Sequence, residues 1–196
     1  PVAGESGVDL VCGGPPCQGY SGIGHRRTFN LNKKDIPSNR LYLEMIRVIK
    51  KVKPRAFLFE NVKGLMSGRW TKEGRKGEIW DDVLTAFMGI KGYVARPTLL
   101  QAKHYGVPQN RPRVIILGVR KDLDGCPDSN CPGDAVEAGL VPARNGAVAP
   151  NLRDLLGDLV DPSYLENNPT VKYLTEPKNE IQRELRSRGG KFTLAK

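Results

Sequence analysis

The sequence predicts an α/β domain built around a largely parallel sheet. Short apolar runs that suit buried strands alternate, over the first 120 residues, with segments in which apolar residues recur at helical spacing. This strand–helix–strand alternation is typical of layered α/β domains. The chain has 196 residues, 39% of them hydrophobic, which suffices for one domain of ordinary size. No stretch approaches the ~18 consecutive apolar residues of a membrane span, so we expect no membrane partner.

The first part of the chain supplies two strands and a helix. An apolar run at residues 8–12 stops at two glycines and two prolines, which predicts a buried strand and a sharp turn. Residues 18–38 lack periodicity and are expected to form a long loop. Apolar spacing predicts a helix over about 40–53, with Asn39 as its cap and Pro54 after its end. Residues 56–59 then form a second predicted strand, which ends at Glu60.

The rest of the chain continues this alternation and then changes character. Residues 79–90 have helical spacing, and residues 93–101 and 114–119 are predicted strands. Residues 122–150 are rich in Gly, Pro and Ala without periodicity, which indicates a linker or variable insert. Two further helices are predicted, an amphipathic one at the leucines of residues 152–159 and a charged one over 176–189.

Positive charge is concentrated in one part of the chain. The formal net charge is +10, which suggests a polyanionic partner. Between Gly22 and Arg55, ten basic residues face only two acidic ones. Taken alone, this stretch is either a solvated helix face or a surface that contacts phosphates.

The four cysteines do not form a disulfide framework. Four in a chain without a secretory leader indicate a reducing compartment. Cys12 ends an apolar run and is expected to be a buried strand residue. Cys126 and Cys131 have no close second pair, so a zinc site there is weakly indicated and we predict no metal ligands.

Three short clusters carry residues suited to chemistry, and each also has a structural interpretation. Cys17 follows two glycines and two prolines at a strand end, where a thiol serves either as a nucleophile or as a small buried residue. Glu60 ends an apolar strand, where a carboxyl is costly unless it is paired, hydrogen-bonded or functional. Its neighbour Asn61 is expected to hold the turn through backbone bonds. Arg111 and Arg113 stand two apart and either clamp an anion or lie at the surface.

Together the three clusters resemble the DNA (cytosine-5) methyltransferases in order and spacing. The matching segments are residues 13–21 (GGPPCQGYS), 60–62 (ENV) and 109–113 (QNRPR). The resemblance covers residues 8–120 well. Residues 151–159 also resemble a segment that often follows the third motif. Residues 176–188 more weakly resemble the lead-in to the target-recognition region of eukaryotic maintenance-type members.

The resemblance implies a covalent mechanism on a flipped-out cytosine, with S-adenosylmethionine as methyl donor. Cys17 would attack carbon 6, and Glu60 would hydrogen-bond the ring nitrogen and the exocyclic amine. Arg113 would contact the cytosine carbonyl and steady the thiolate, and Arg111 would support the site. Glu60, Arg111, Arg113 and Cys17 are thus the implied catalytic residues.

The resemblance also assigns binding and structural residues. Residues 18–36 would be a mobile catalytic loop, with Gln18, Ser21, Arg26 and Arg27 contacting DNA. Pro16 and Leu41 match positions near the cofactor. Asn61 and Gln109 are given structural roles.

The implied fold is a Rossmann-like methyltransferase sheet with helices on both faces, incomplete at both ends. The family's Phe-x-Gly-x-Gly turn, its acidic ribose ligand and its Gly-Asn-rich motif are absent. We therefore expect these residues alone to bind S-adenosylmethionine poorly and to show little activity. Residues 1–121 would be the central part of the catalytic domain, 122–150 a linker or insert, and 151–196 the lead-in to target recognition, with regulatory domains flanking them. DNA is the expected partner, and the location would be the nucleus in a eukaryote and otherwise the cytoplasm.

Two alternatives remain open. One is a tRNA cytosine-5 methyltransferase, whose Cys-Phe-Thr signature is missing here; the nearest string is residues 191–193. The other is a non-catalytic nucleic-acid-binding protein that retains the scaffold, against which the presence of Cys17, Glu60 and Arg113 argues. The target sequence, a preference for hemimethylated DNA and the oligomeric state are not predicted.

Overall fold

The structure is a computed structural model, and it describes residues 7–16, 36–128, 133–143, 146, 148–159, 176–188 and 191–192. The chain divides into two compact units. The first contains residues 1–101 and 111–145, and the second contains residues 102–110 and 146–196. The first unit holds the predicted α/β domain.

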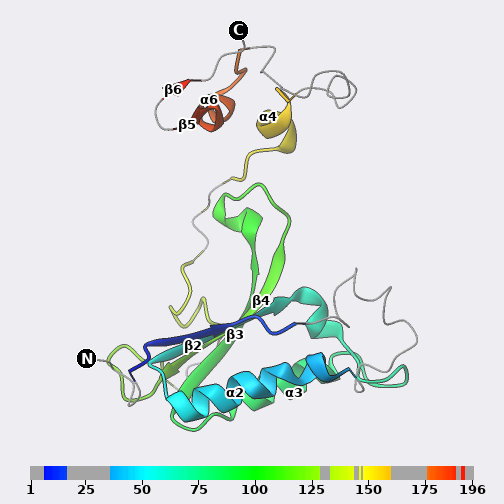
Figure 1. The fold of residues 1–196 in the computed structure, drawn as a ribbon, viewed down its shortest axis with the longest axis vertical. Helices are drawn as coiled ribbons and strands as arrows, with labels where there is room; N and C mark the ends of the chain where they lie inside the picture. The colour runs from blue at the N-terminus through cyan, green and yellow to red at the C-terminus, as the bar shows by residue number, and fades with distance from the viewer. Residues whose placement is uncertain are drawn as a thin grey trace. The chain divides into compact units, whose positions relative to one another are not determined.

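A four-stranded sheet forms the centre of the first unit (Figure 1). Its strands are β1 (Leu10–Gly13), β2 (Ala56–Val62), β3 (Tyr93–Gln101) and β4 (Pro112–Arg120), in the order β1-β2-β4-β3. The α/β class is confirmed, but the expected largely parallel sheet is not what these strands form. Only β1 and β2 are parallel, whereas β4 runs antiparallel to both β2 and β3. The short link between β3 and β4 holds no crossover helix, so the two strands pair as antiparallel neighbours.

Two helices lie where the apolar spacing predicts them. Helix α2 spans Leu41–Val52 and follows a short 3-10 turn at Pro37–Arg40. It ends at Lys53, whose left-handed backbone (φ 48°) lets its N–H donate to the Ile49 carbonyl at 2.8 Å. Helix α3 spans Glu78–Met88, with acidic residues in its first turn, where the helix dipole favours them.

Both helices cover the same face of the sheet (Figure 1). Their buried side chains pack on alternate residues of β2, Phe57 and Phe59, which are 0% and 1% exposed. The ring centroid of Phe87 on α3 lies 4.8 Å from that of Phe59 and 5.6 Å from that of Phe57. The expectation of helices on both faces is therefore not met by the described residues, because α2 and α3 share one core.

The opposite face is covered in part by the segment predicted as a linker. Ala135 is fully buried, and its N–H donates to the Pro97 carbonyl at 2.9 Å. The Thr98 hydroxyl donates to Asp134 Oδ2 at 2.6 Å. On β1, Cys12 is exposed among the described residues, so its predicted burial is wrong. Cys12 alternates with Val11, which is partly buried against the core, and therefore points away from the core that the two helices cover.

The second unit contains two short helices and a small hairpin. They are α4 (Leu152–Leu156), α6 (Glu180–Arg186), β5 (Ser187–Arg188) and β6 (Lys191–Phe192). Both helices are shorter than predicted, and each begins at an asparagine whose side chain accepts the N–H three residues on. Arg186 of α6 forms a buried ion pair with Asp158, two residues after α4, with Arg186 Nη2 2.6 Å from Asp158 Oδ2. No helix in the described parts of the chain is long and apolar enough to cross a membrane.

Candidate active site

Glu60 and Arg113 form an ion pair across two adjacent strands. Glu60 on β2 is paired in register with Ile115 on β4, so Arg113 is its diagonal neighbour on the same face of the sheet. The Nε of Arg113 lies 2.6 Å from Oε1 of Glu60. This nitrogen is buried and not aligned as a hydrogen-bond donor, so the contact is a short-range charge interaction. The two side chains are 22% and 39% exposed, so the paired carboxyl stays accessible.

The backbone of Gly14 borders the other oxygen of this carboxyl. A Cβ at Gly14 would lie 2.9 Å from Glu60 Oε2, closer than ordinary van der Waals contact. The absence of a side chain therefore lets the loop after β1 pass beside the carboxyl. Gly14 lies within the motif of residues 13–21, but the motif does not predict that it borders Glu60. The two consecutive glycines at the end of the strand are the sequence feature that indicates such a close approach of the backbone.

Asn61 ties the same loop to the end of β2. It is 5% exposed, and its Nδ2 donates to the Pro15 carbonyl at 3.2 Å. Its Oδ1 accepts the N–H of Val62 at 2.9 Å. Asn61 therefore bonds backbone groups on both sides, and it fixes the segment that leads toward Cys17 against the strand that carries Glu60.

A small hollow joins this loop to the start of α2. Its lining includes Pro16, Asn39, Tyr42 and Leu65, with Pro15 and Phe59 among the other side chains around it. Burial raises the pKa of Tyr42 above its usual value, and the nearby Asp82 carboxylate adds to this rise. The Tyr42 phenol is therefore neutral at physiological pH. Pro16, which lines this hollow, and Leu41, which precedes Tyr42 in the chain, are both exposed apolar residues.

The structure does not bring all the predicted residues together. Cys17, Gln18, Ser21, Arg26 and Arg27 lie outside the described residues. Arg111 precedes β4 and is exposed, and no contact with Glu60 is found for it among the described residues. Gln109 belongs to the second unit, so it is not placed relative to Glu60.

The described residues do not form a metal site. Among them, no three His, Cys, Asp or Glu side chains gather as metal ligands do. Cys126 is a free, partly buried thiol, and Cys131 lies outside the described residues.

Comparison with known proteins identifies relatives of the chain. The model of the C-5 cytosine-specific DNA methylase family matches residues 3–193. The Type II methyltransferase M.BsuRI of Bacillus subtilis is 40% identical over 152 residues, which cover 78% of this chain and 30% of the relative. The Type II methyltransferase M.AgeI of Thalassovita gelatinovora is 32% identical over 199 residues, which cover 95% of this chain and 43% of the relative.

One solved structure has a similar fold over a similar share of this chain. It is a prophage-encoded DNA modification methyltransferase from E. coli, 28% identical with a TM-score of 0.50. The match covers 78% of this chain and 35% of that one.

The comparisons bear on the predicted family and on the predicted location. The chain spans less than half the length of these relatives. The two curated relatives are bacterial, so the expected nuclear location has no support. The resemblance inferred from the three motifs is confirmed, and the chain belongs to the C-5 cytosine-specific DNA methylase family.

Proposed function

We propose that this chain carries the catalytic centre for methyl transfer to carbon 5 of cytosine in DNA, with Cys17 as the nucleophile. The observation that carries the proposal is the setting of Glu60. Its carboxyl is held by Arg113 on one side and bordered by Gly14 on the other. Asn61 anchors the segment that ends one residue before Cys17 to the same strand end.

Glu60 would recognise and activate the base. Cytosine presents an acceptor at ring nitrogen 3 and a donor at its exocyclic amine. A carboxyl shares a proton with the first and accepts a hydrogen bond from the second. Negative charge that enters the ring during attack would thereby be stabilised where it develops. A base reaches such a group only when it leaves the helical stack, so the proposal includes base flipping.

Arg113 would fix the geometry of that carboxyl. Its Nη1 donates to the Pro112 carbonyl at 2.9 Å, so the guanidinium is held from its own strand as well as by Glu60. The remaining N–H groups of the fork can donate to the cytosine carbonyl oxygen. A fixed cation at this position would also favour a thiolate at Cys17. Arg111, two residues before Arg113, would support the site.

The covalent step forms and breaks bonds at carbons 5 and 6 of the cytosine. The Cys17 sulfur forms a bond to carbon 6, and the ring electrons make carbon 5 nucleophilic. After methylation, the proton on carbon 5 is lost to a base. The electron pair left on carbon 5 re-forms the double bond to carbon 6, and the Cys17 sulfur leaves as thiolate.

S-adenosylmethionine, when bound, supplies the electrophilic methyl group for carbon 5. Pro16 and Leu41 would contact it, since both present exposed apolar surface on adjoining segments. That surface suits an apolar wall beside the donor. DNA contacts are assigned to Gln18, Ser21, Arg26 and Arg27.

A mechanism-based trap tests the proposal. Duplex DNA containing 5-fluorocytosine is incubated with S-adenosylmethionine and the complete protein that carries these residues. Fluorine does not leave carbon 5 as a proton does, so the working enzyme remains bonded to the DNA. We expect an adduct that survives denaturation and is absent from Cys17→Ser. No adduct with wild-type protein, or an equal yield from Cys17→Ser, contradicts the proposal, and an adduct on tRNA alone assigns the activity to RNA.

A further inference from the structure

The loop at residues 68–77 is a basic segment close to the candidate active site. It contains Arg69, Lys72, Arg75 and Lys76 against the single acid Glu73, and all five are exposed. It follows β2 through the 3-10 turn Lys63–Ser67, whose Leu65 lines the same hollow as Pro15 and Pro16. The loop therefore leaves the edge of the sheet that carries Glu60. We call residues 68–77 the tryptophan-anchored loop.

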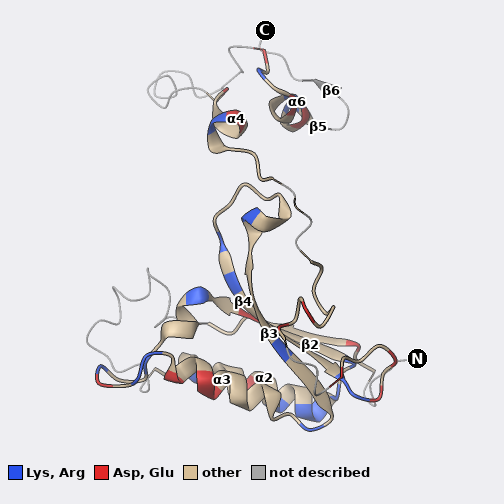
Figure 2. Ribbon diagram, turned by 180° about the vertical axis from the view of Figure 1, so that it is seen from behind, with Lys and Arg blue, Asp and Glu red and all other residues tan. Residues whose placement is uncertain are grey.

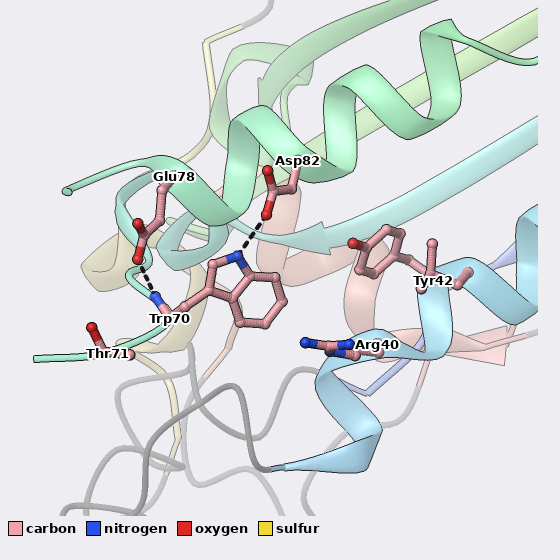
Figure 3. A pocket seen from close by; sticks show the side chains of 7 residues that line it. Arg40, Tyr42, Trp70, Thr71, Glu78 and Asp82 are labelled. Atoms are coloured by element: carbon pink, nitrogen blue, oxygen red, sulfur yellow. Dashed lines mark hydrogen bonds between the residues drawn. The ribbon is translucent and has the colours of Figure 1, made fainter. Parts of the chain in front are cut away.

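Trp70 fastens this loop to α3 and to the start of α2. Its backbone N–H donates to Glu78 Oε1 at 2.5 Å, and its indole Nε1 donates to Asp82 Oδ2 at 2.6 Å (Figure 3). The guanidinium of Arg40 lies 5.8 Å from the ring centroid, within cation–π range. Backbone bonds close the base of the loop, where the Gly77 N–H donates to the Gly68 carbonyl at 3.1 Å. These contacts hold the loop against α3 and the start of α2.

The neighbouring acids are engaged in this attachment. Glu78 and Asp82 accept from Trp70 and line a pocket beside it, and Asp81 pairs with Arg75. Three cations of the loop differ from Arg75: they are Arg69, Lys72 and Lys76. Among the described residues, none of these three pairs with an acid, and none lines that pocket. Figure 2 shows the Lys and Arg positions of this loop in blue next to the acidic positions of α3 in red.

We propose that the tryptophan-anchored loop is a contact surface for the phosphate backbone of duplex DNA, with Arg69, Lys72 and Lys76 as the contacting residues. The inference rests on the proposed function and adds a contact outside the residues assigned to DNA above. Three cations that pair with no acid in the described part of the chain suit a polyanion, since they are already gathered on one short, anchored segment. Phosphate contacts position a duplex without reading its sequence. The loop would therefore orient DNA over the Glu60 edge of the sheet whatever the target sequence.

The salt dependence of DNA binding tests this surface. Each lost phosphate contact lowers the slope of log K against log [salt] by about 0.9. The triple variant Arg69→Gln/Lys72→Gln/Lys76→Gln should therefore reduce the slope by about 2.7. Between 50 and 200 mM salt, the wild-type protein should then lose about 40-fold more affinity than the variant does. The weakening should be equal for duplexes of unrelated sequence.

A matched variant controls for net charge. Lys50→Gln/Lys51→Gln/Lys91→Gln also removes three positive charges. They come from exposed positions at the end of α2 and after α3, away from the Glu60 edge. The control should keep the wild-type slope. Equal slope changes in the two triples, or none in the loop triple, overturn the inference, as does an effect confined to structured RNA. Failure of the proposed function is separate, because it appears as the lack of a 5-fluorocytosine adduct with unmodified protein.

Discussion

Replacing Gly118 by alanine should strongly destabilise the sheet. Gly118 on β4 lies directly opposite Phe57 on β2. A Cβ at this position would lie 2.1 Å from Cε1 and 2.2 Å from Cζ of the Phe57 ring. Ordinary carbon contacts are about 3.5–4.0 Å, so the ring would have to withdraw by roughly 1.5 Å.

The ring has no space into which it can withdraw. Phe57 is 0% exposed, and its ring centroid lies 5.6 Å from that of Phe87 and 5.5 Å from that of Tyr93. Overpacked cores lose about 1–3 kcal/mol and occasionally more. The depth of this overlap places Gly118→Ala at about 3 kcal/mol of lost unfolding free energy.

A double-mutant cycle separates this clash from other effects of alanine. Phe57→Leu removes three ring carbons and should cost about 2 kcal/mol by itself, at ~0.8 kcal/mol per buried carbon. In that background Gly118→Ala should be nearly neutral, because the ring is gone and alanine restricts the unfolded chain by ~0.4–1 kcal/mol. The coupling energy should therefore be about 3 kcal/mol.

Urea unfolding measures all four proteins, with the midpoint compared at constant slope. Costs that add to within ~0.5 kcal/mol would mean that the two positions do not interact as described. A loss below ~1 kcal/mol for Gly118→Ala alone would refute the packing argument.

Three other predictions follow from the same structure. Gly14→Ala should slow cytosine methylation about tenfold, because a displaced Glu60 carboxyl loses rate at ~10²-fold per ångström. Gly13→Ala is the control, because its Cβ would meet only the flexible Met45 side chain, whose nearest atom is the sulfur at 3.1 Å. Equal rates for the two variants would contradict this. Asp158→Ala should cost about 3–5 kcal/mol of unfolding free energy, because the buried arginine loses its carboxylate; hydrogen exchange should rise in α4 and α6 and stay unchanged in the four-stranded sheet. Burial raises the pKa of Tyr42 above 10.0. The contribution of this group to the free energy of unfolding should therefore be complete below that pH and should be lost as the pH rises through the higher pKa of the folded state. Absorbance at 295 nm should show a phenol that ionises late and that Tyr42→Phe removes.

Local patterns in the sequence determined most of the elements. The spacing of apolar residues placed α2 and β3 at nearly their observed bounds, since one buried face is enough to set a helical or strand period. The order and spacing of three motifs indicated the family, which the family model confirms. Glu60 was singled out because a carboxyl at the end of an apolar strand requires a reason.

The tertiary structure decided how these elements pair and what the motif residues touch. Strand direction depends on partners distant in sequence, so the antiparallel place of β4 between β2 and β3 could not be deduced from periodicity. The burial of Cys12 was predicted wrongly because an apolar run does not say which of its faces is covered. The contacts of Glu60 with Arg113 and Gly14 join residues 53 and 46 positions apart, and that of Trp70 with Asp82 depends on how a loop folds back on its helix. Such contacts arise when the chain closes on itself, and only the folded structure fixes them.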